Sequence, residues 1–530
     1  MNIINESILK IAKRSETKNR DYLVKTFVSV GPLSTIMTNK DHEVIYGRRG
    51  TGKTHALAYL TDKLQEKPNI VVNIDLRTLG SNGGLFSDGS LSLSERATRL
   101  LIDTIQQIGD GIISIVLENN GDDFDLSEVA PLVDTLKSSI VDISIEKIND
   151  IEYEVSNNNT ASNSKKSSNS LALSLDTIKG NLSSEKSSKI EEGVTTREKI
   201  TGKEVHKVHF SSVYNNLRRI SDSVGQHIWI LFDEWAEIPT DLQPYLAELI
   251  RRTILPNQNI TVKIAAIEQR TNLAVVKNNN RIGIEIGADI AASQNLDEYM
   301  VFDNDEEKSS SFFKELLFHH FIGVTEIDDS LNIKTPDDFI NSTFTQINTF
   351  TEFVRASEGV PRDAINILSI AAIKADDAKI SIDHIRYAAR TWYTRGKEKA
   401  IASREEAFAL LQWIRHEVIG ERNSRAFLLK ANHRDNLIDH LFDARVLHII
   451  KENVSGKDAL GVRYNVYSID YGCYVDLINT VNAPKGLFIA TELSNENLDE
   501  ITYIDVPKTD YRAIRRAVLD LDKFYSNINA

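Results

Sequence analysis

Short apolar runs alternate with longer amphipathic segments along the amino-terminal part of the chain. The runs lie at residues 43–46, 69–75, 227–232, 260–267 and 281–286. Each is shorter than a typical helix and rich in apolar, β-branched residues, which favours buried strands of a parallel sheet. The segments between them, among them 93–118 and 242–255, have apolar residues at helical spacing. Strands that alternate with helices predict an α/β fold, in which helices cover both faces of a parallel sheet.

The pattern changes in the carboxy-terminal part. From Ser309 the sequence is mostly helical, and Pro361 stands at a position that favours the start of a helix. Further along, two helices are followed by two strands with a polar turn between them, which is the outline of a winged helix. The helices are expected at 402–419 and 434–444, and the strands at 446–450 and 462–469.

A polar stretch interrupts the amino-terminal part at about 156–192, within a surface insertion expected at about 120–210. It is rich in Ser, Asn and Lys and has too few apolar residues to offset the entropy of an ordered chain. Leu171, Leu173 and Leu175 alternate with small residues, which predicts a β-hairpin inside it. Two alternatives stay open, a surface insertion that contains this hairpin and a mobile loop with no role, because long loops are often either functional or disordered.

Residues 47–54 read GRRGTGKT, a complete G-x-x-x-x-G-K-T phosphate loop between a predicted strand and a predicted helix. Its glycines allow a tight turn whose N–H groups point at phosphate oxygens, and the following helix adds its positive dipole end. Lys53 is expected to reach the β- and γ-phosphates, and the Thr54 hydroxyl to ligate Mg²⁺. The residues expected to bind the nucleotide are Gly47, Gly50, Thr51, Gly52, Lys53, Thr54 and His55.

The apolar run at 227–232 ends in two carboxylates, Asp233 and Glu234, which is the Walker B pattern. Asp233 is expected to hold Mg²⁺ together with Thr54. Glu234 is then placed to polarise a water for attack on the γ-phosphate. Together the two motifs predict an enzyme that binds ATP with Mg²⁺ and hydrolyses it.

Composition sets limits on where such an enzyme works. The chain has 530 residues, a net charge of −14, 41% apolar residues and a single cysteine. This length predicts more than one domain, and the lone cysteine is compatible with a reducing compartment. We find no signal-peptide pattern and expect no membrane span, so a cytoplasmic location is expected. The negative charge argues against a protein coated in nucleic acid but leaves room for a local basic patch.

The ordered motifs resemble the AAA+ ATPases, in particular the branch related to origin-recognition initiator ATPases. The resemblance rests on the phosphate loop, on Asp233 and Glu234, and on residues 358–368, EGVPRDAINIL, which look like the sensor 2 helix of that branch. It implies that Arg362 reaches from a helical lid to the γ-phosphate and joins Lys53 and Glu234 as a catalytic residue. It also implies a homo-oligomer in which a neighbouring subunit contributes an arginine.

The resemblance implies four parts. They are an ATPase core over 1–302, a helical lid over 303–400, a winged-helix-like domain over 401–480, and a tail over 481–530 with a basic docking helix at 511–518. The sequence departs from the family at sensor 1, where Glu268 or Gln269 must serve, and at 425–429, which looks like a strand. Arg252, Arg270 and Arg281 are the candidates for the arginine given to a neighbour.

Two biological roles stay open. The first is a switch or assembly ATPase that acts on double-stranded DNA through its carboxy-terminal module. Its phosphate contacts would come from Arg422, Arg425, Lys430, Arg434 and the ribbon tip at Lys457. The second is a signalling or anti-phage defence ATPase, in which the winged helix and the insertion bind a protein effector. That role rests on analogy at the level of the family.

Overall fold

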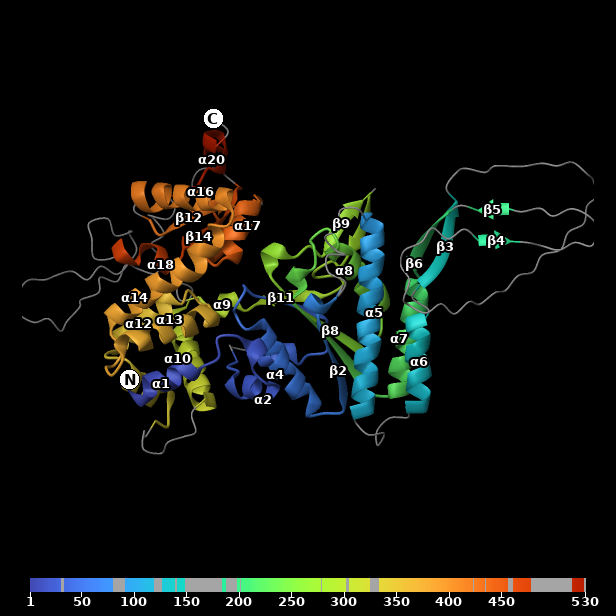
Figure 1. Cartoon of the computed structure of the whole chain (residues 1–530), viewed down its shortest axis with the longest axis horizontal. Coiled ribbons are helices and arrows are strands. Elements are labelled where there is room, and N and C mark those ends of the chain that lie inside the picture. The colour runs from blue at the N-terminus through green and yellow to red at the C-terminus, as the bar shows by residue number, and fades with distance from the viewer. Residues whose placement is uncertain are drawn as a thin grey trace, which may run out of the picture.

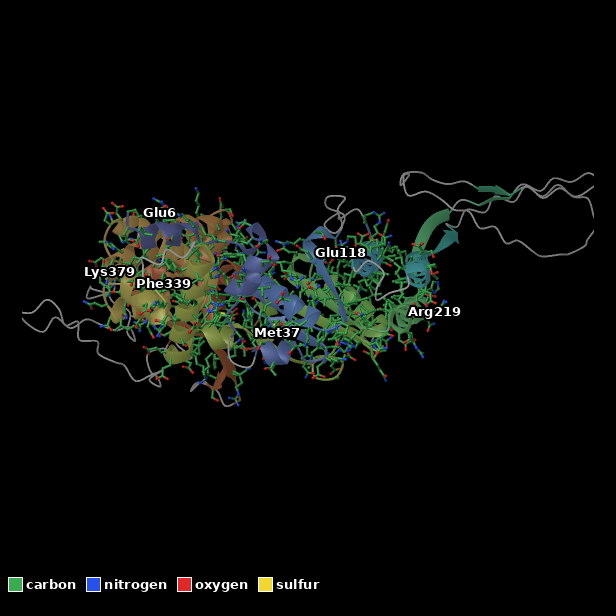
Figure 2. The ribbon with its side chains drawn as sticks, turned by 90° about the horizontal axis from the view of Figure 1, so that it is seen from below. Glu6, Met37, Glu118, Arg219, Phe339 and Lys379 are labelled. Atoms are coloured by element: carbon green, nitrogen blue, oxygen red, sulfur yellow. The ribbon has the colours of Figure 1, made fainter. Side chains whose placement is uncertain are left out.

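In the computed structural model, a core built around a parallel sheet lies beside a second half made of the lid and the carboxy-terminal module (Figure 1). Seen from below in Figure 2, Met37, Glu118 and Arg219 belong to the core, and Glu6, Phe339 and Lys379 to the second half. The structure describes residues 1–29, 33–79, 91–118, 126–138, 141–147, 184–186, 198–200, 202–277, 279–301, 305–324, 333–422, 424–433, 435–455, 461–477 and 517–528.

The core sheet has the strand order β11-β1-β8-β7-β2, and every neighbouring pair is parallel. The strands are β1 (Glu43–Tyr46), β2 (Asn69–Asp75), β7 (His227–Asp233), β8 (Ile260–Ala266) and β11 (Ala291–Asn295). The first four confirm the predicted strands, and the α/β fold with a parallel sheet is confirmed with them. Because all five strands run the same way, their carboxyl ends meet at one edge.

The prediction of a fifth sheet strand at 281–286 is wrong. Instead, β9 (Ala274–Lys277) and β10 (Asn280–Gly283) form a separate antiparallel hairpin. Gly283 ends β10 with a φ of +117°, a conformation that only glycine adopts without strain, and a Cβ there would clash with the Leu273 carbonyl oxygen. The fifth strand is β11, whose sequence AASQN carries no apolar run and so gave no strand signal.

Alternation along the strands divides the core between the two faces of the sheet. On β2, Val71 packs on the face covered by α4 (Lys53–Gln65), whereas Ile70 and Val72 pack on the opposite face. That second face is covered by α5 (Leu93–Glu118), α7 (Phe210–Val224) and α8 (Gln243–Thr253). The two-sided covering explains why the strands are apolar almost throughout.

By length and composition alone, α5 is apolar enough to cross a membrane. In the structure its residues Leu100, Ile105, Ile108 and Ile112 are completely buried, and the helix packs against β2 and against α6 (Leu126–Ser138). These contacts are those of a core helix in a folded domain.

The lid consists of α10 (Glu306–Val324), α11 (Pro336–Thr343), α12 (Ile347–Ala356), α13 (Pro361–Ala375) and α14 (Ile382–Trp392). Pro361 is the first residue of α13, as its position predicted. The amino terminus joins this half. Helix α1 (Ile3–Lys10) packs on α13, while α2 (Arg20–Thr26) packs on α4 of the core.

The carboxy-terminal module begins with α16 (Glu405–Ile414) and α17 (Asn436–Asp443), and its sheet has the order β12-β14-β13. The expected ribbon is β13 (Leu447–Ser455) with β14 (Arg463–Ile469), and β12 (Ala426–Lys430) confirms the strand expected at 425–429. One hydrophobic cluster runs through lid and module, and α14 continues through a π-helix (Tyr393–Glu398) and α15 (Lys399–Ile401). The lid and the carboxy-terminal module are therefore packed together and are not separated by a linker at residue 400.

The docking helix expected at 511–518 falls largely outside the described residues. Its last two residues, Ala517 and Val518, are extended, and Val518 forms a parallel bridge with Leu428 of β12. Helical structure resumes only at α20 (Leu521–Ile528), so a helix through residue 518 is wrong. The main-chain bonds between Leu428 and residues 517 and 519 compete with helix formation there.

The expected insertion is divided into a packed part and a projecting part. Val129, Val133 and Leu136 of α6 are buried in the core, so the projecting part begins at residue 141 rather than near 120. There β3 (Val141–Lys147) and β6 (Gly202–Val208) form an antiparallel ribbon at the end of the core away from the lid (Figure 1). Two short strands, β4 (Ser184–Lys186) and β5 (Glu198–Ile200), pair with each other. The hairpin expected around Leu171–Leu175 lies outside the described residues.

Replacing residues 156–192 by a short Gly-Ser linker should leave the melting temperature within about 2 °C of the wild type. The free energy of closing a loop changes slowly with its length. Calorimetry on the two proteins measures this. Val133→Asp, which buries a charge in α6, is the control that should lower the melting temperature strongly. A comparable loss in the linker variant would contradict the prediction.

Candidate functional site

The phosphate loop joins the carboxyl end of β1 to α4. Gly50 and Gly52 have φ values of +91° and +93°, so both positions need glycine. The Thr51 hydroxyl donates to the carbonyl of Arg48 at 2.8 Å, which fixes the turn. Helix α4 begins at Lys53, so its first N–H groups and the positive end of its dipole face the loop. The strand–loop–helix order expected from the motif is therefore present.

Lys53 is folded back onto the loop. Its ammonium donates to the carbonyls of Gly47 at 2.9 Å and of Arg48 at 3.0 Å, and the residue is buried. Burial lowers the pKa of Lys53, while the nearby carboxylates of Glu234 and Asp233 act in the opposite direction. An anion at the loop would replace the two carbonyls as the partner of this ammonium.

Asp233 is the last residue of β7, Glu234 follows it, and β8 lies between this strand and β1. Burial raises the pKa of Asp233, and a hydrogen bond from Thr54 opposes that shift. The pKa of Glu234 is raised by burial and then by the charge of Asp233, while Lys53 opposes both. Asp233 is opposite Asp75 in the β2–β7 register, so acidic groups are concentrated at this edge.

Glu234 has an unusual backbone. Its φ and ψ of 56° and 43° are left-handed, which non-glycine residues rarely adopt. Its N–H donates to the Asp233 carboxylate at 2.8 Å, and a short helix begins at the next residue. Backbone strain of this kind is often retained at functional sites.

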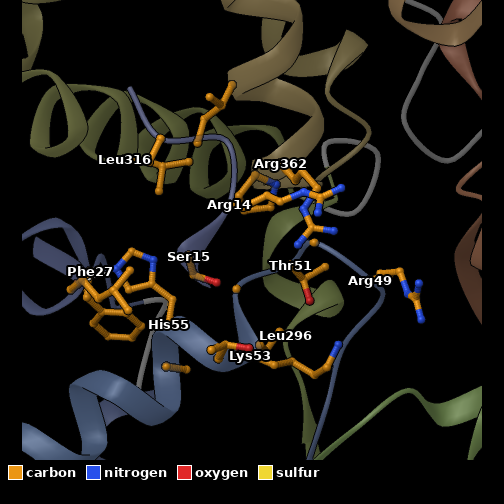
Figure 3. Close-up of a pocket in the computed structure, with 18 of the residues that line it drawn as sticks. Arg14, Ser15, Phe27, Arg49, Thr51, Lys53, His55, Leu296, Leu316 and Arg362 are labelled. Atoms are coloured by element: carbon orange, nitrogen blue, oxygen red, sulfur yellow. Dashed lines mark hydrogen bonds between the residues drawn. The ribbon is translucent and has the colours of Figure 1, made fainter. Parts of the chain in front are cut away.

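A cavity of about 320 Å³ opens above the loop. Its polar side contains Arg49, Lys53, Thr54, Glu234 and Arg362. Its other side is apolar and aromatic, with Phe27, Leu296, Phe312, Leu316 and Ile365 among the lining residues. Figure 3 shows Arg49, Lys53 and Arg362 around the loop, and Phe27, His55 and Leu316 further to one side. Such a pocket suits a ligand with a charged tail and a flat apolar head.

Arg362 enters this pocket from the lid. It is the second residue of α13, and its N–H donates to the carbonyl of Gly50 at 3.2 Å. The contact is close, since a Cβ at Gly50 would lie 2.9 Å from the Cβ of Arg362. The lid helix therefore touches the phosphate loop directly, and the side chain of Arg362 extends beside it (Figure 3).

Two neutral histidines lie on the other side of the pocket. His55 Nε2 contacts the carbonyl of Leu23, and because a carbonyl only accepts, this nitrogen carries the proton. His320 Nδ1 lies 3.0 Å from the Tyr22 hydroxyl. Burial lowers the pKa of His55 and lowers that of His320 to about 3. Of the expected nucleotide contacts, His55 thus belongs to this side rather than to the loop.

Arg48 is a site residue that motif reasoning missed, because the motif allows any residue there. Only 2% of it is exposed. Its Nε donates to Asp297 of α9 (Asp297–Met300) at 2.9 Å, and its Nη2 to the carbonyl of Glu358 before α13 at 2.9 Å. Its Nη1 contacts His448 of β13. One guanidinium therefore joins the phosphate loop to the lid and to the carboxy-terminal module.

The network continues beyond Arg48. An arginine only donates, so His448 Nδ1 accepts and its Nε2–H donates to Asp470 at 3.1 Å. Asp470 contacts Lys397, whose Nζ lies 2.8 Å from Asp363 of α13. Asp363 also accepts from Arg445 at 3.1 Å. The buried network that begins at Arg48 therefore ends at Asp363, the residue after Arg362.

The charged side chains in this buried network keep one another ionised. Burial alone would raise the pKa of Asp363, but Lys397 and Arg445 hold it well below its usual range. The pKa of Lys397 is lowered by burial and raised more by Asp363 and Asp470. Burial lowers the pKa of His448 to about 4, so the imidazole is neutral near pH 7.

The expected trans-acting arginines do not line the cavity. Arg252 pairs with Glu248, Arg281 lies 2.6 Å from Glu285, and Arg270 lies 3.3 Å from Asp443 of the module. The sensor 1 candidates Glu268 and Gln269 follow β8, which separates β1 from β7. Glu268 accepts from the Asn295 amide at 3.2 Å.

The basic cluster expected to contact DNA is only partly described. Arg422 donates to the carbonyl of Val518 at 2.7 Å and lies 3.6 Å from Glu417, so it serves contacts within the module. Lys430 is exposed at the end of β12. Arg425 lies just before β12, and Arg434 and Lys457 lie outside the described residues. Arg422 is thus less available for phosphate contacts than its sequence position indicated.

Within the described ranges, no group of three or more His, Cys, Asp or Glu side chains is arranged to hold a metal ion by itself. Thr54 and Asp233, which are hydrogen-bonded to each other, offer a hydroxyl and a buried carboxylate at the loop. Mg²⁺ is usually held by one or two such oxygens together with the phosphates of a substrate. The donor set therefore fits Mg²⁺ that arrives with a nucleotide.

No model of a known protein family matches the chain, and no curated protein matches it either.

The buried His448 predicts a pH dependence of stability. Its pKa in the folded protein is about 4, below the ordinary 6.5, so the unfolded chain binds a proton first as the pH falls. The contribution of neutral His448 to the free energy of unfolding is complete above about pH 6.5. It is lost as the pH falls toward 4, by up to about 3 kcal/mol. His448→Gln should remove this part of the acid destabilisation in calorimetry over that range.

His416→Gln is the matched control, because His416 is 68% exposed and outside the network. The control should keep the pH dependence of the wild type. Parallel curves for the wild type and the His448 variant would show that His448 does not titrate in this way.

Proposed function

We propose that this protein binds ATP with Mg²⁺ and hydrolyses it to ADP and phosphate. One observation carries the proposal: Lys53 and Thr54 of the phosphate loop lie beside Asp233 and Glu234, which come from a segment far away in the chain. Lys53, Thr54 and Glu234 line the cavity, and Asp233 is hydrogen-bonded to Thr54. Ligand sites of parallel α/β sheets lie at the carboxyl ends of the strands, which is where these residues lie.

Each residue then has a separate task. The loop N–H groups, Lys53 and Arg362 bind the phosphates. Thr54 and Asp233 would hold Mg²⁺, which would supply positive charge beside the phosphates when bound. Glu234, whose pKa is raised by burial and by Asp233, accepts a proton from the attacking water. The water oxygen bonds to the γ-phosphorus, and ADP leaves with the electron pair of the broken bond.

The arrangement also supports the proposal of an AAA+ ATPase of the initiator-like branch. The lid helix that carries Arg362 packs against the phosphate loop, as the sensor 2 assignment requires. The carboxy-terminal module combines helices with a three-stranded antiparallel sheet, which is compatible with a winged-helix-like domain. Within the described residues of the module, the order is a helix, a strand, a helix and then the ribbon, without the additional helix of an ordinary DNA-reading module.

We further propose that the ATPase works as a switch. Arg48 of the loop contacts the lid and the module at once, so a change at the phosphates alters contacts in both. The target is double-stranded DNA or a protein effector, reached through the carboxy-terminal module. The internal contacts of Arg422 make the protein effector the better supported of the two.

Lys53→Ala and Glu234→Gln should fail in different ways. Loss of the ammonium removes a charge-assisted contact to phosphate, so binding and turnover should fall together. Glu234→Gln should keep ATP affinity within about twofold and lose turnover by about 10²- to 10⁴-fold, because only proton transfer is removed. Titration with a fluorescent ATP analogue and a phosphate-release assay measure the two effects.

Lys63→Ala and Glu66→Gln, which remove an exposed ion pair at the far end of α4, are matched controls and should behave as the wild type. Equal loss of affinity in the Lys53 and Glu234 variants would contradict the separate tasks.

Arg362→Ala should reduce the difference between the ATP- and ADP-bound states, since the lid loses its contact with the γ-phosphate. Small-angle scattering of the two states in the Glu234→Gln background detects lid closure without hydrolysis. Lys374→Ala at the other end of α13 is the control, because this lysine is exposed. An unchanged difference in the Arg362 variant would contradict the sensor 2 role.

A further inference from the structure

A second arginine enters the cavity from the amino-terminal segment. Arg14 lines the same pocket as Arg362 and the phosphate loop, and it is exposed rather than packed. Figure 3 draws both arginines at the same end of the pocket, on the lid side of Thr51 and Lys53. The two lie far apart in the sequence, so no motif would have grouped them.

Arg14 lies in a segment that connects the two halves across the cavity. We call residues 11–19, between α1 and α2, the strap. On one side, the Asn5 amide donates to the carbonyl of Asp376 at 2.8 Å, which ties α1 to the end of α13. On the other side, α2 packs on α4, and Arg20 lies 3.7 Å from Asp62. Movement of the lid on the core therefore also moves Arg14 relative to the loop.

The ion pairs of the pocket distinguish Arg14 from two other arginines that line it, Arg49 and Arg77. Arg49 lies 2.6 Å from Glu237, and Arg77 lies 2.6 Å from Asp75, so both are neutralised by their own carboxylates. In the part of the chain that the structure describes, neither Arg14 nor Lys13, which also lines the cavity, forms an ion pair with a carboxylate. A positive group without a counter-charge beside Lys53 and Arg362 favours an anion between them.

We propose that Arg14 binds the γ-phosphate of ATP from within the same chain and supplies the charge that a neighbouring subunit's arginine was expected to give. The inference rests on the proposed ATPase function. The bond between the γ-phosphorus and the β–γ bridging oxygen breaks, water supplies the new oxygen, and Glu234 takes its proton. Arg14 donates to the γ-phosphate oxygens, over which negative charge is spread during transfer.

The three arginines expected to act in a neighbour support this assignment. Each already pairs with a carboxylate of its own chain: Arg252 with Glu248, Arg270 with Asp443 of the module at 3.3 Å, and Arg281 with Glu285 just after the hairpin at 2.6 Å. With Arg14 and Arg362 both present, the γ-phosphate has two guanidinium contacts in one chain. Hydrolysis then needs no second subunit.

The test compares Arg14→Ala and Arg14→Lys with Lys10→Ala. Lys10 is a matched control, because it is exposed on the neighbouring helix, pairs only with Glu6 and does not line the cavity. Dissociation constants are measured for a non-hydrolysable ATP analogue with Mg²⁺ and for ADP. Turnover per chain is measured across a wide range of protein concentrations.

Arg14→Ala should weaken binding of the triphosphate analogue about tenfold and leave binding of ADP unchanged, since one charge-assisted contact to the γ-phosphate is lost. Arg14→Lys should recover part of the loss, and Lys10→Ala should match the wild type. Turnover per chain in the wild type should be independent of protein concentration.

The ratio of the dissociation constants for the triphosphate analogue and for ADP is compared between variants. An equal ratio in Arg14→Ala and Lys10→Ala would overturn the inference. Turnover per chain that rises with protein concentration would overturn it as well, because a neighbour would then complete the site. A wild-type protein that binds neither nucleotide would instead overturn the proposed ATPase function. The two failures are therefore distinguishable.

Discussion

The buried guanidinium of Arg48 is the contact on which the arrangement of the two halves depends. It lies in the phosphate loop, yet each of its three nitrogens has a partner elsewhere: in α9, in the turn before the lid helix α13 and in the carboxy-terminal module. A buried charge is costly unless every donor has a partner. The partners of Arg48 come from three segments, so satisfying this one residue requires the loop, the lid and the module to be assembled together.

The chain of charges beyond Arg48 extends this requirement to the lid itself. Asp363 follows Arg362 on α13 and is held by Lys397 and Arg445, whereas Arg362 faces the cavity. The orientation of the helix is thus set from one side by buried ion pairs and from the other by its N–H contact with Gly50. Moving one partner out of such a network leaves an unpaired buried charge, which is costly. The lid is therefore expected to change between two discrete positions rather than to move gradually.

Burial also determines the chemistry at the cavity. It raises the pKa of Glu234 and lowers that of Lys53, and each charge partly offsets the shift of the other. A carboxylate with a raised pKa is a better proton acceptor, and water is partly excluded from the same place. The apolar half of the cavity, where His55 and His320 are neutral, would be compatible with a flat, uncharged ring.

What the sequence determined by itself was local. The apolar runs at β1, β2, β7 and β8, the loop from Gly47 to Thr54 and the proline that begins α13 all follow from periodicity, glycine geometry and proline geometry over a few residues. The polar strand β11 was missed because its place in the sheet comes from pairing with β1, and the hairpin β9–β10 was mistaken for a sheet strand because an apolar run does not specify its partner. The positions of Arg48 and Arg14 were decided only by tertiary structure, since a charged side chain gains its partners from segments hundreds of residues away, and no local pattern records which ones.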